Sequence, residues 1–300
     1  MRPLSVGIQL PEVEWEVPCP ELLAMAKTAE AVGFDSLWLG DHLLYDLPVG
    51  PRGPWEVWTS LAAVAAVTSR ILLGPLVAST SFHAPAMLAK QAATVDAISN
   101  GRLIVGLGAG WNEREYQAFG FPFDRRVSRF AEAFTIISTL LAEGEIDFDG
   151  TFYRAQNCVL HPRSVTPGGP PLMVGSAKPR MLAITGSHIT YWNVWWTDHS
   201  NDPQKFAALK REVDERLAAV GRAAGEVQAT CAILVQLDDG YGRQMGAKER
   251  VDPLRGTPLE IADRLRAFAA AGATHVQLVV DPITRTSIEA FADVLHELDR

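Results

Sequence analysis

Short apolar runs alternate along the chain with longer segments in which apolar residues recur every three or four positions. The runs end on glycine, serine or acidic residues, a pattern typical of strands that are buried on both faces of a parallel sheet. They predict strands at residues 5–10, 36–39, 71–78, 103–106, 171–174, 191–194, 229–235 and 275–280. The amphipathic segments between them predict helices at about 21–31, 60–67, 85–98, 126–142, 179–185, 203–223, 258–270 and 287–299.

About eight strand–helix units in one run predict an α/β fold, a (β/α)8 barrel of the TIM type that occupies residues 1–300 as a single domain. Two domains with doubly wound sheets are the alternative. The alternation is interrupted between residues 144 and 171, where Gly150 and the turn residues 167–171 separate short alternating pieces. We expect this segment to be an insertion after the fourth unit, with a small hairpin that covers the barrel mouth.

The stretch from Gly101 to Gly120 combines a buried strand with three alternating glycines, Gly106, Gly108 and Gly110. The dinucleotide fingerprint requires a third glycine where this chain has Trp111, so that motif is excluded. A strand end without side chains, beside the indole of Trp111 and the amide of Asn112, is expected to form a floor for a flat ring.

Asn112 and Glu115 have the spacing of a helix capping box, which is a second explanation for both side chains.

The net charge of −8 argues against a general nucleic-acid or membrane-surface binder, because both need a basic face. No apolar run reaches the roughly 18–20 residues of a membrane span. The apolar run within the first eleven residues is too short for a signal peptide. Cys19, Cys158 and Cys231 form no CxxC pair, which favours reduced cysteines and a cytoplasmic protein.

In a barrel of this type, functional residues lie at the carboxyl ends of the strands and in the loops that follow. The candidates at these positions are glycines, polar side chains and tryptophans: Gln9, Asp41, His42, Ser79, Thr80, Ser81, Gly108, Gly110, Trp111, Asn112, Gly175, Ser176, Asn193, Trp195 and Trp196. The seven histidines show no metal-ligand spacing, and the chain has no Gly-x-Ser-x-Gly elbow. The set therefore predicts a site for a large planar organic ligand, without a metal.

Two candidates have a structural alternative. His42 follows a strand beside Asp41, a carboxylate that would orient the imidazole or raise its pKa, although a lone histidine is often only a packed or surface residue. Gly175 and Ser176 precede a helix that begins with Lys178 and Arg180, which favours a bound phosphate over a simple cap by Ser176. The remaining residues that suggest chemistry are expected in loops or on solvated faces: His83, His161, His199, His296, Arg125, Arg126 and Arg129. Trp38 and Trp192 lie near predicted strand ends, as Trp111, Trp195 and Trp196 do, and are expected to contribute to an aromatic pocket, with core packing as the alternative.

Four blocks of the sequence, residues 34–42, 74–85, 101–115 and 256–278, resemble the luciferase-like flavin and deazaflavin oxidoreductases. The resemblance covers nearly the whole chain. It implies a (β/α) barrel with an insertion after the fourth unit, which holds FMN or the deazaflavin coenzyme F420 at its carboxyl face.

The resemblance also implies roles for individual residues. Asp41 and His42 match the acidic residue and histidine near the ring, with His42 as the acid/base residue. Leu76 and Val77 match the position of a non-prolyl cis peptide that bulges against the ring. The other matched positions contact the ring, its side chain or its phosphate: Ser79, Gly108, Gly110, Asn112, Gly175 and Ser176.

One position departs from the family pattern. Sugar-phosphate dehydrogenases of the family carry a proton-donating glutamate just after the Gly-x-Gly turn, where this chain has Trp111. This difference argues against a sugar-phosphate substrate.

From the resemblance we expect hydride transfer between the cofactor ring and a small organic substrate, with His42 supplying or accepting the proton. F420 is the expected cofactor. An FMN-dependent monooxygenase that works with a separate flavin reductase is one alternative, and a non-catalytic flavin-binding barrel is another. The resemblance also favours a homodimer.

Overall fold

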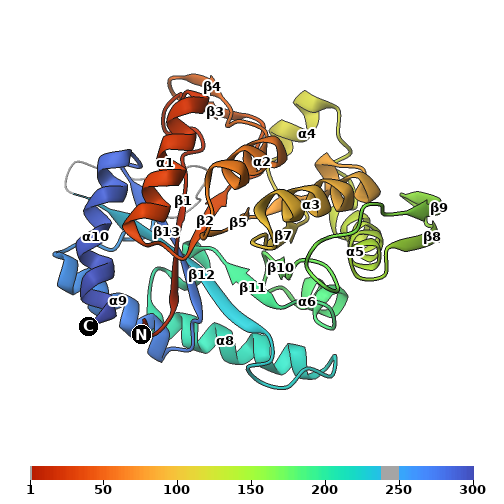
Figure 1. The fold of residues 1–300 in the computed structure, drawn as a ribbon. Coiled ribbons are helices and arrows are strands. Elements are labelled where there is room, and N and C mark those ends of the chain that lie inside the picture. The colour runs from red at the N-terminus through yellow and green to blue at the C-terminus, as the bar shows by residue number, and fades with distance from the viewer. Residues whose placement is uncertain (1, 238–249) are drawn as a thin grey trace.

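Within residues 2–237 and 250–300, which the structure describes, nine parallel strands form one sheet that curls round on itself inside a layer of helices (Figure 1). The protein is represented here by a computed structural model. The sheet order is β5-β2-β1-β13-β12-β11-β10-β7-β6. These strands are β1 (Ser5–Gln9), β2 (Ser36–Leu39), β5 (Leu72–Pro75), β6 (Ala78–Ser79), β7 (Val105–Gly108), β10 (Leu172–Val174), β11 (Tyr191–Val194), β12 (Gln228–Gln236) and β13 (His275–Asp281).

The barrel closes between β5 and the residues that precede β7, where Leu73 and Leu103 form an isolated parallel bridge. Strands β5 and β6 occupy one position of the barrel, because the cis peptide bond between Leu76 and Val77 separates them. The predicted strand 71–78 is therefore two short strands, and the predicted TIM-type barrel is confirmed. The cis peptide lies where the family resemblance implied it.

Long helices pack around the sheet close to their predicted positions. They are α1 (Cys19–Val32), α2 (Val57–Val67), α3 (Pro85–Ser99), α5 (Arg126–Ala142), α6 (Pro179–Thr185), α8 (Pro203–Ala218), α9 (Pro258–Ala270) and α10 (Arg285–Asp299). Local sequence explains their starts: in α9, Thr257 and Glu260 form a reciprocal capping box and Pro258 is the first helical residue. Helix α8 ends at Ala218, five residues before the predicted end at 223.

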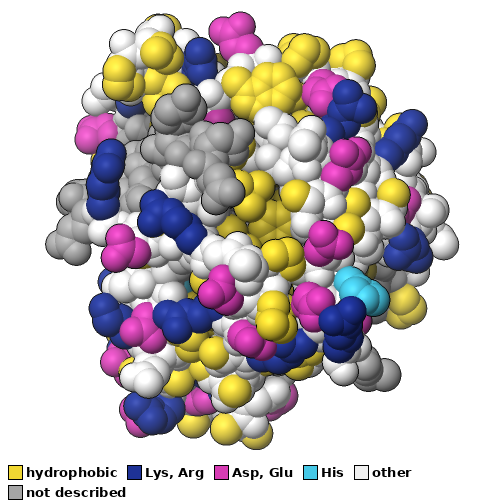
Figure 2. All heavy atoms as spheres, turned by 90° about the vertical axis from the view of Figure 1, so that its left-hand side faces the viewer, with side chains coloured by type: hydrophobic (Ala, Val, Ile, Leu, Met, Phe, Trp, Pro, Cys, Tyr) yellow, Lys and Arg dark blue, Asp and Glu magenta, His cyan; other side chains and the backbone are white. Residues whose placement is uncertain are grey.

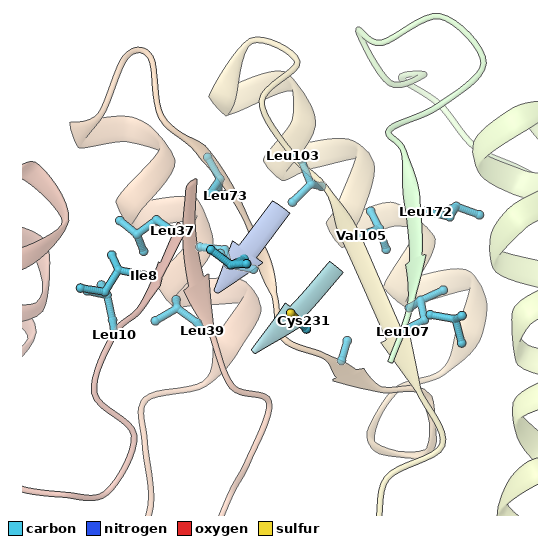
Figure 3. Packing of buried hydrophobic residues seen from close by; sticks show 14 of the residues in the cluster. Ile8, Leu10, Leu37, Leu39, Leu73, Leu103, Val105, Leu107, Leu172 and Cys231 are labelled. Atoms are coloured by element: carbon cyan, nitrogen blue, oxygen red, sulfur yellow. The ribbon is translucent and has the colours of Figure 1, made fainter. Parts of the chain in front are cut away.

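The core lies between the barrel and the helices. Alternate strand residues, among them Ile8, Leu37, Leu39, Val105 and Leu107, pack with the buried faces of the helices in one large cluster. Figure 3 shows these side chains on neighbouring strands. The residues between them face the barrel interior, because side chains alternate along a strand, and they form separate small clusters such as Trp38, Ile104 and Met173.

Part of the barrel interior is polar. The Trp38 indole N–H donates to Ser36 Oγ at 2.7 Å, and Ser36 Oγ lies 2.6 Å from Nε2 of His275. Since the hydroxyl accepts from the indole, its own hydrogen is free to go to an unprotonated Nε2. Burial lowers the pKa of His275 to about 4, so the ring is neutral near pH 7. Trp38 and Trp192 are fully buried, so the core-packing alternative holds for both instead of a place in the pocket.

Two short hairpins leave the barrel. Strands β3 (Tyr45–Leu47) and β4 (Gly50–Arg52) pair in a segment where no strand was predicted. The hairpin predicted within 144–171 is present as β8 (Glu145–Asp149) and β9 (Arg154–Val159). Its expected place over the barrel mouth is wrong: Glu132 of α5 accepts from the backbone N–H groups of residues 151–153 and ties its turn to the outside of that helix.

The surface carries no broad area of one charge on the face drawn in Figure 2, where Lys, Arg, Asp and Glu side chains are interspersed. Among the residues that the structure describes, no helix is both long enough and apolar enough to cross a membrane.

Candidate active site

A cavity of about 1160 Å³ opens at the carboxyl ends of the strands. It is lined by loops that follow β1, β2, β7, β10 and β11 and by the segment between β5 and β6. Most of the predicted site residues meet there: Gln9, Asp41, His42, Leu76, Val77, Ser79, Gly108, Gly110, Trp111, Gly175, Ser176, Asn193, Trp195 and Trp196. Asn112 does not line the cavity; its side-chain amide donates to the Leu44 carbonyl at 3.0 Å.

His42 is held by a buried carboxylate that is distant in sequence. Its Nδ1 lies 3.1 Å from both carboxylate oxygens of Glu115, on the short helix α4 (Glu113–Phe119). The His42 side chain is 17% exposed and that of Glu115 only 1%. Burial opposes a charged imidazole, but the hydrogen bond with Glu115 and the negative charges of Glu12, Glu115 and Asp41 outweigh it and raise the pKa of His42.

Asp41 meets its prediction in part: its negative charge helps to raise the pKa of His42, but its carboxylate bonds to other groups. Its Oδ2 accepts from the Ser79 backbone N–H at 2.8 Å and lies 3.1 Å from Nε2 of His83. Adjacent side chains on an extended backbone point in opposite directions, so Asp41 does not orient the His42 ring by a hydrogen bond. Asp41 instead fixes the chain just after the cis peptide, and His83, which was expected in a loop without a role, is its partner.

Ser79 is placed at the cavity by Tyr116. The Tyr116 hydroxyl donates to the Ala109 carbonyl at 2.9 Å and lies 3.1 Å from Ser79 Oγ. Because the tyrosine proton goes to the carbonyl, the Ser79 hydroxyl donates to the tyrosine oxygen. The lone pairs of Ser79 Oγ then remain to accept from a ligand in the cavity.

Aromatic rings surround the exposed edge of His42. The imidazole lies 4.8 Å from the Tyr45 ring and 5.7 Å from that of Trp111, which is half exposed. Trp195 and Trp196 lie against each other, 3.9 Å apart, on another part of the lining. Trp196 is 2% exposed, and its Nε1 has no hydrogen-bond acceptor among the described residues.

Cationic residues lie in the region of the cavity next to Gly175 and Ser176. Ser176 Oγ accepts from the Lys178 backbone N–H at 3.1 Å, but the N-cap residue of α6 is Lys178, so Ser176 is not the helix cap; Ser176 and Lys178 both line the cavity. Arg126 also lines it, contrary to the predicted solvated face. Arg180 instead donates to Ser128 Oγ.

Residues 7–243 match the family model of the luciferase-like monooxygenases. The chain belongs to this family. It is similar to a 5,10-methylenetetrahydromethanopterin reductase from Archaeoglobus fulgidus, with 25% identity over 92% of this chain and 74% of the reductase. It is also 30% identical to the pyrimidine monooxygenase RutA of Caulobacter vibrioides, over 61% of this chain and about half, 51%, of RutA.

This chain also has the same fold as a solved structure of an F420-dependent secondary alcohol dehydrogenase in complex with an F420–acetone adduct. The two chains superpose with a TM-score of 0.81 at 18% identity, over 99% of each. Relatives of this chain are oxidoreductases and monooxygenases, and the chain is an oxidoreductase of the luciferase-like type.

The glycines of this luciferase-like barrel make room for protein atoms as well as lining the cavity. A Cβ on Gly108 or Gly175 would lie 2.7 or 2.6 Å from Val77 Cγ2, and one on Gly106 would lie 3.0 Å from Val77 Cγ1. Three glycines from β7 and the end of β10 thus surround Val77, beside the cis peptide. The expectation of a bare floor beneath a ring accordingly needs correction, because Val77 occupies part of that space.

Gly110 is expected to be sensitive to substitution for the same reason. Its φ is +71°, and a Cβ there would collide with Tyr116 Oη and lie 2.5 Å from Ser79 Oγ. Gly120 is a matched control, with a φ of +77° and no atom within 4 Å of its Cβ position. We expect Gly110→Ala to reduce the free energy of unfolding by about 1–3 kcal/mol more than Gly120→Ala does, measured by chemical denaturation. Equal losses would show that the Tyr116–Ser79 contact tolerates a methyl group.

Two residues were misjudged from the sequence, and one was missed. Glu115 forms no capping box with Asn112 and holds His42 instead. Tyr116, which the sequence analysis did not single out, supports Ser79. His199 was expected in a loop or on a solvated face, but it is fully buried, and burial lowers its pKa to about 4. No group of three or more His, Cys, Asp or Glu side chains in the described ranges is placed to bind a metal ion.

Proposed function

We propose that this protein is an F420-dependent oxidoreductase that transfers a hydride between the deazaflavin ring and a small organic substrate, with His42 exchanging the accompanying proton. The observation that carries the proposal is the placement of His42. The imidazole is on the wall of the large cavity, its Nδ1 is held by the buried Glu115, and its pKa is raised. A positioned histidine with a pKa above its ordinary value near 6.5 is suited to hold a proton at neutral pH.

The residues of the cavity fit a ring cofactor of this kind. The volume of about 1160 Å³ exceeds the range of about 300–1000 Å³ of ordinary small-molecule sites, so it has room for a cofactor ring together with a substrate. Ser79 offers an acceptor to such a ligand. Lys178 supplies positive charge two residues after Ser176, where the family resemblance expects the cofactor phosphate, and Arg126 adds a second positive charge to the cavity lining.

Bound F420 would supply the hydride chemistry, and the protein residues have the other tasks. Leu76, Val77, Ser79, Gly108, Gly110 and Trp111 would contact the ring region, and Gly175 and Ser176 the phosphate; Asn112 would act indirectly, by fixing Leu44. Asp41 holds the Ser79 backbone in place. His42 donates a proton from Nε2 when the substrate is reduced and accepts one when it is oxidised. Tyr45 and Trp111 restrict water at that position.

The alternative is an FMN-dependent monooxygenase that obtains reduced flavin from a separate reductase. The similarity to RutA, a pyrimidine monooxygenase, supports it. The preference for F420 rests on the overall resemblance of the sequence and not on any single residue. In either case, Trp111 in place of the family glutamate argues against a sugar phosphate and for an apolar or aromatic substrate.

A binding titration with F420 and with FMN, followed by tryptophan fluorescence, tests the proposal. Trp111→Phe should reduce the quenching, whereas Trp55→Phe, a half-exposed tryptophan outside the cavity lining, should not. Micromolar or tighter binding of F420 with weak FMN binding is the expected result. Tight binding of FMN alone would indicate the FMN-dependent monooxygenase instead. If neither F420 nor FMN quenched the fluorescence, the proposal that the protein binds one of them would be overturned.

A further inference from the structure

Glu115 has a buried carboxylate that faces nitrogen atoms of one short segment, residues 42–44. Its Oε1 accepts from the backbone N–H groups of Leu43 at 2.6 Å and Leu44 at 3.1 Å. Both of its oxygens also lie 3.1 Å from His42 Nδ1. Three consecutive residues after β2 therefore converge on a single carboxylate from α4.

This geometry constrains the proton on the imidazole. The backbone N–H groups of Leu43 and Leu44 can only donate, so Oε1 of Glu115 acts as an acceptor. An ionised carboxylate accepts hydrogen bonds but donates none, so the 3.1 Å contacts require a hydrogen on Nδ1. In the described part of the chain His42 Nε2 makes no hydrogen bond, and the ring lines the cavity.

We propose that Glu115 is the positioning residue of the active site: it keeps His42 in the Nδ1-protonated form and leaves Nε2 as the atom that exchanges a proton with the ligand. The inference rests on the proposed role of His42. It adds that a side chain outside the reacting atoms fixes which nitrogen acts. It also explains why Glu115 lies on α4, one residue before Tyr116, since the same short helix then places both His42 and Ser79.

The other groups near His42 either raise its pKa, as Glu115 does, or carry no charge. Glu12, which follows β1, and Asp41, which follows β2, add negative charge, and the Tyr45 ring packs 4.8 Å away. Glu115 is distinguished from them because it alone touches Nδ1 among the described residues. Its removal should accordingly change the tautomer as well as the pKa.

The first test determines the His42 tautomer in the wild-type protein. In the full chain labelled with ¹⁵N-histidine, with the His42 signals assigned by their loss in His42→Asn, neutral His42 is expected to carry its proton on Nδ1. A ring protonated on Nε2 would overturn the proposal. The measurement is independent of activity and of the cofactor, so it remains informative if the proposed function fails.

The second test compares Glu115→Gln with Glu113→Gln. Glu113 is on the same helix, but it accepts only from Gln117 at 3.3 Å and is exposed. Glu115→Gln should lower kcat for substrate reduction by about 100-fold with little change in KM, because proton transfer and not binding is affected. Glu113→Gln should resemble the wild type.

The pH profile separates positioning from a purely structural role. In the reductive direction turnover falls as pH rises through the pKa of His42, and Glu115 raises that pKa, so Glu115→Gln should move the fall to lower pH. Glu115→Asp keeps the charge and should restore part of the shift. An unmoved profile together with an unchanged His42 titration would overturn the proposal. A moved titration with unchanged turnover would instead reject the proton-transfer role of His42.

Discussion

His42→Asn is expected to lower turnover by about 10²- to 10⁴-fold, the usual contribution of a positioned general acid or base. Asparagine retains a polar side chain of similar length near Glu115 but cannot exchange a proton at neutral pH. Because the cavity keeps its other contacts, the affinity for the cofactor should change little. The measurement is kcat for the first substrate found by screening, together with the fluorescence titration of the cofactor.

The matched control is His296→Asn, on the exposed face of α10 far from the cavity lining. It should leave kcat and cofactor affinity at wild-type values. If His42→Asn retained full turnover across the pH range while His296→Asn behaved as expected, His42 would not be the proton carrier. Loss of cofactor binding in His42→Asn would instead assign the imidazole to the cofactor contacts.

The barrel itself follows from simple patterns in the sequence. Runs such as 36–39 and 275–280 are buried on both faces, and such runs have no competing explanation when amphipathic helices separate them. The break in the third strand was invisible in that pattern, because residues 71–78 are uniformly apolar on both sides of the cis peptide. The β3–β4 hairpin was missed because β4 begins with glycine and proline, which normally disfavour strands, and β3 is only three residues long.

The residues that line the cavity were largely predictable, whereas the pairs they form were not. The carboxyl ends of parallel strands meet on one face, so Asp41, His42, Ser79 and Gly175 were expected together. The partner of His42 was not, because Glu115 is 73 positions away and its spacing from Asn112 also fits a local cap. In the structure the Glu115 carboxylate forms hydrogen bonds with three groups on residues 42–44 instead of capping its own helix.

Arg102→Met is expected to reduce the free energy of unfolding by about 3–5 kcal/mol, the cost of removing one partner from a buried charged network. The Arg102 guanidinium is buried and donates to the carbonyls of Ala65 and Thr68 at the end of α2, Ser99 at the end of α3, and Ile71 before β5. It also donates to Thr68 Oγ1 at 2.9 Å. Helix carboxyl ends carry partial negative charge, so two of them stabilise the cation without a carboxylate in contact.

Methionine fills a similar volume but leaves those four carbonyls without their donor, and each buried acceptor without a partner costs about 1–3 kcal/mol. The control is Arg154→Met on the β8–β9 hairpin, where the arginine is 63% exposed and paired with Asp149. Its loss should change stability by less than about 1 kcal/mol. Denaturant midpoints compare the two variants. Equal midpoints would mean that water replaces the guanidinium at the carbonyls, and that the packing of α2, α3 and β5 holds this side of the barrel without Arg102.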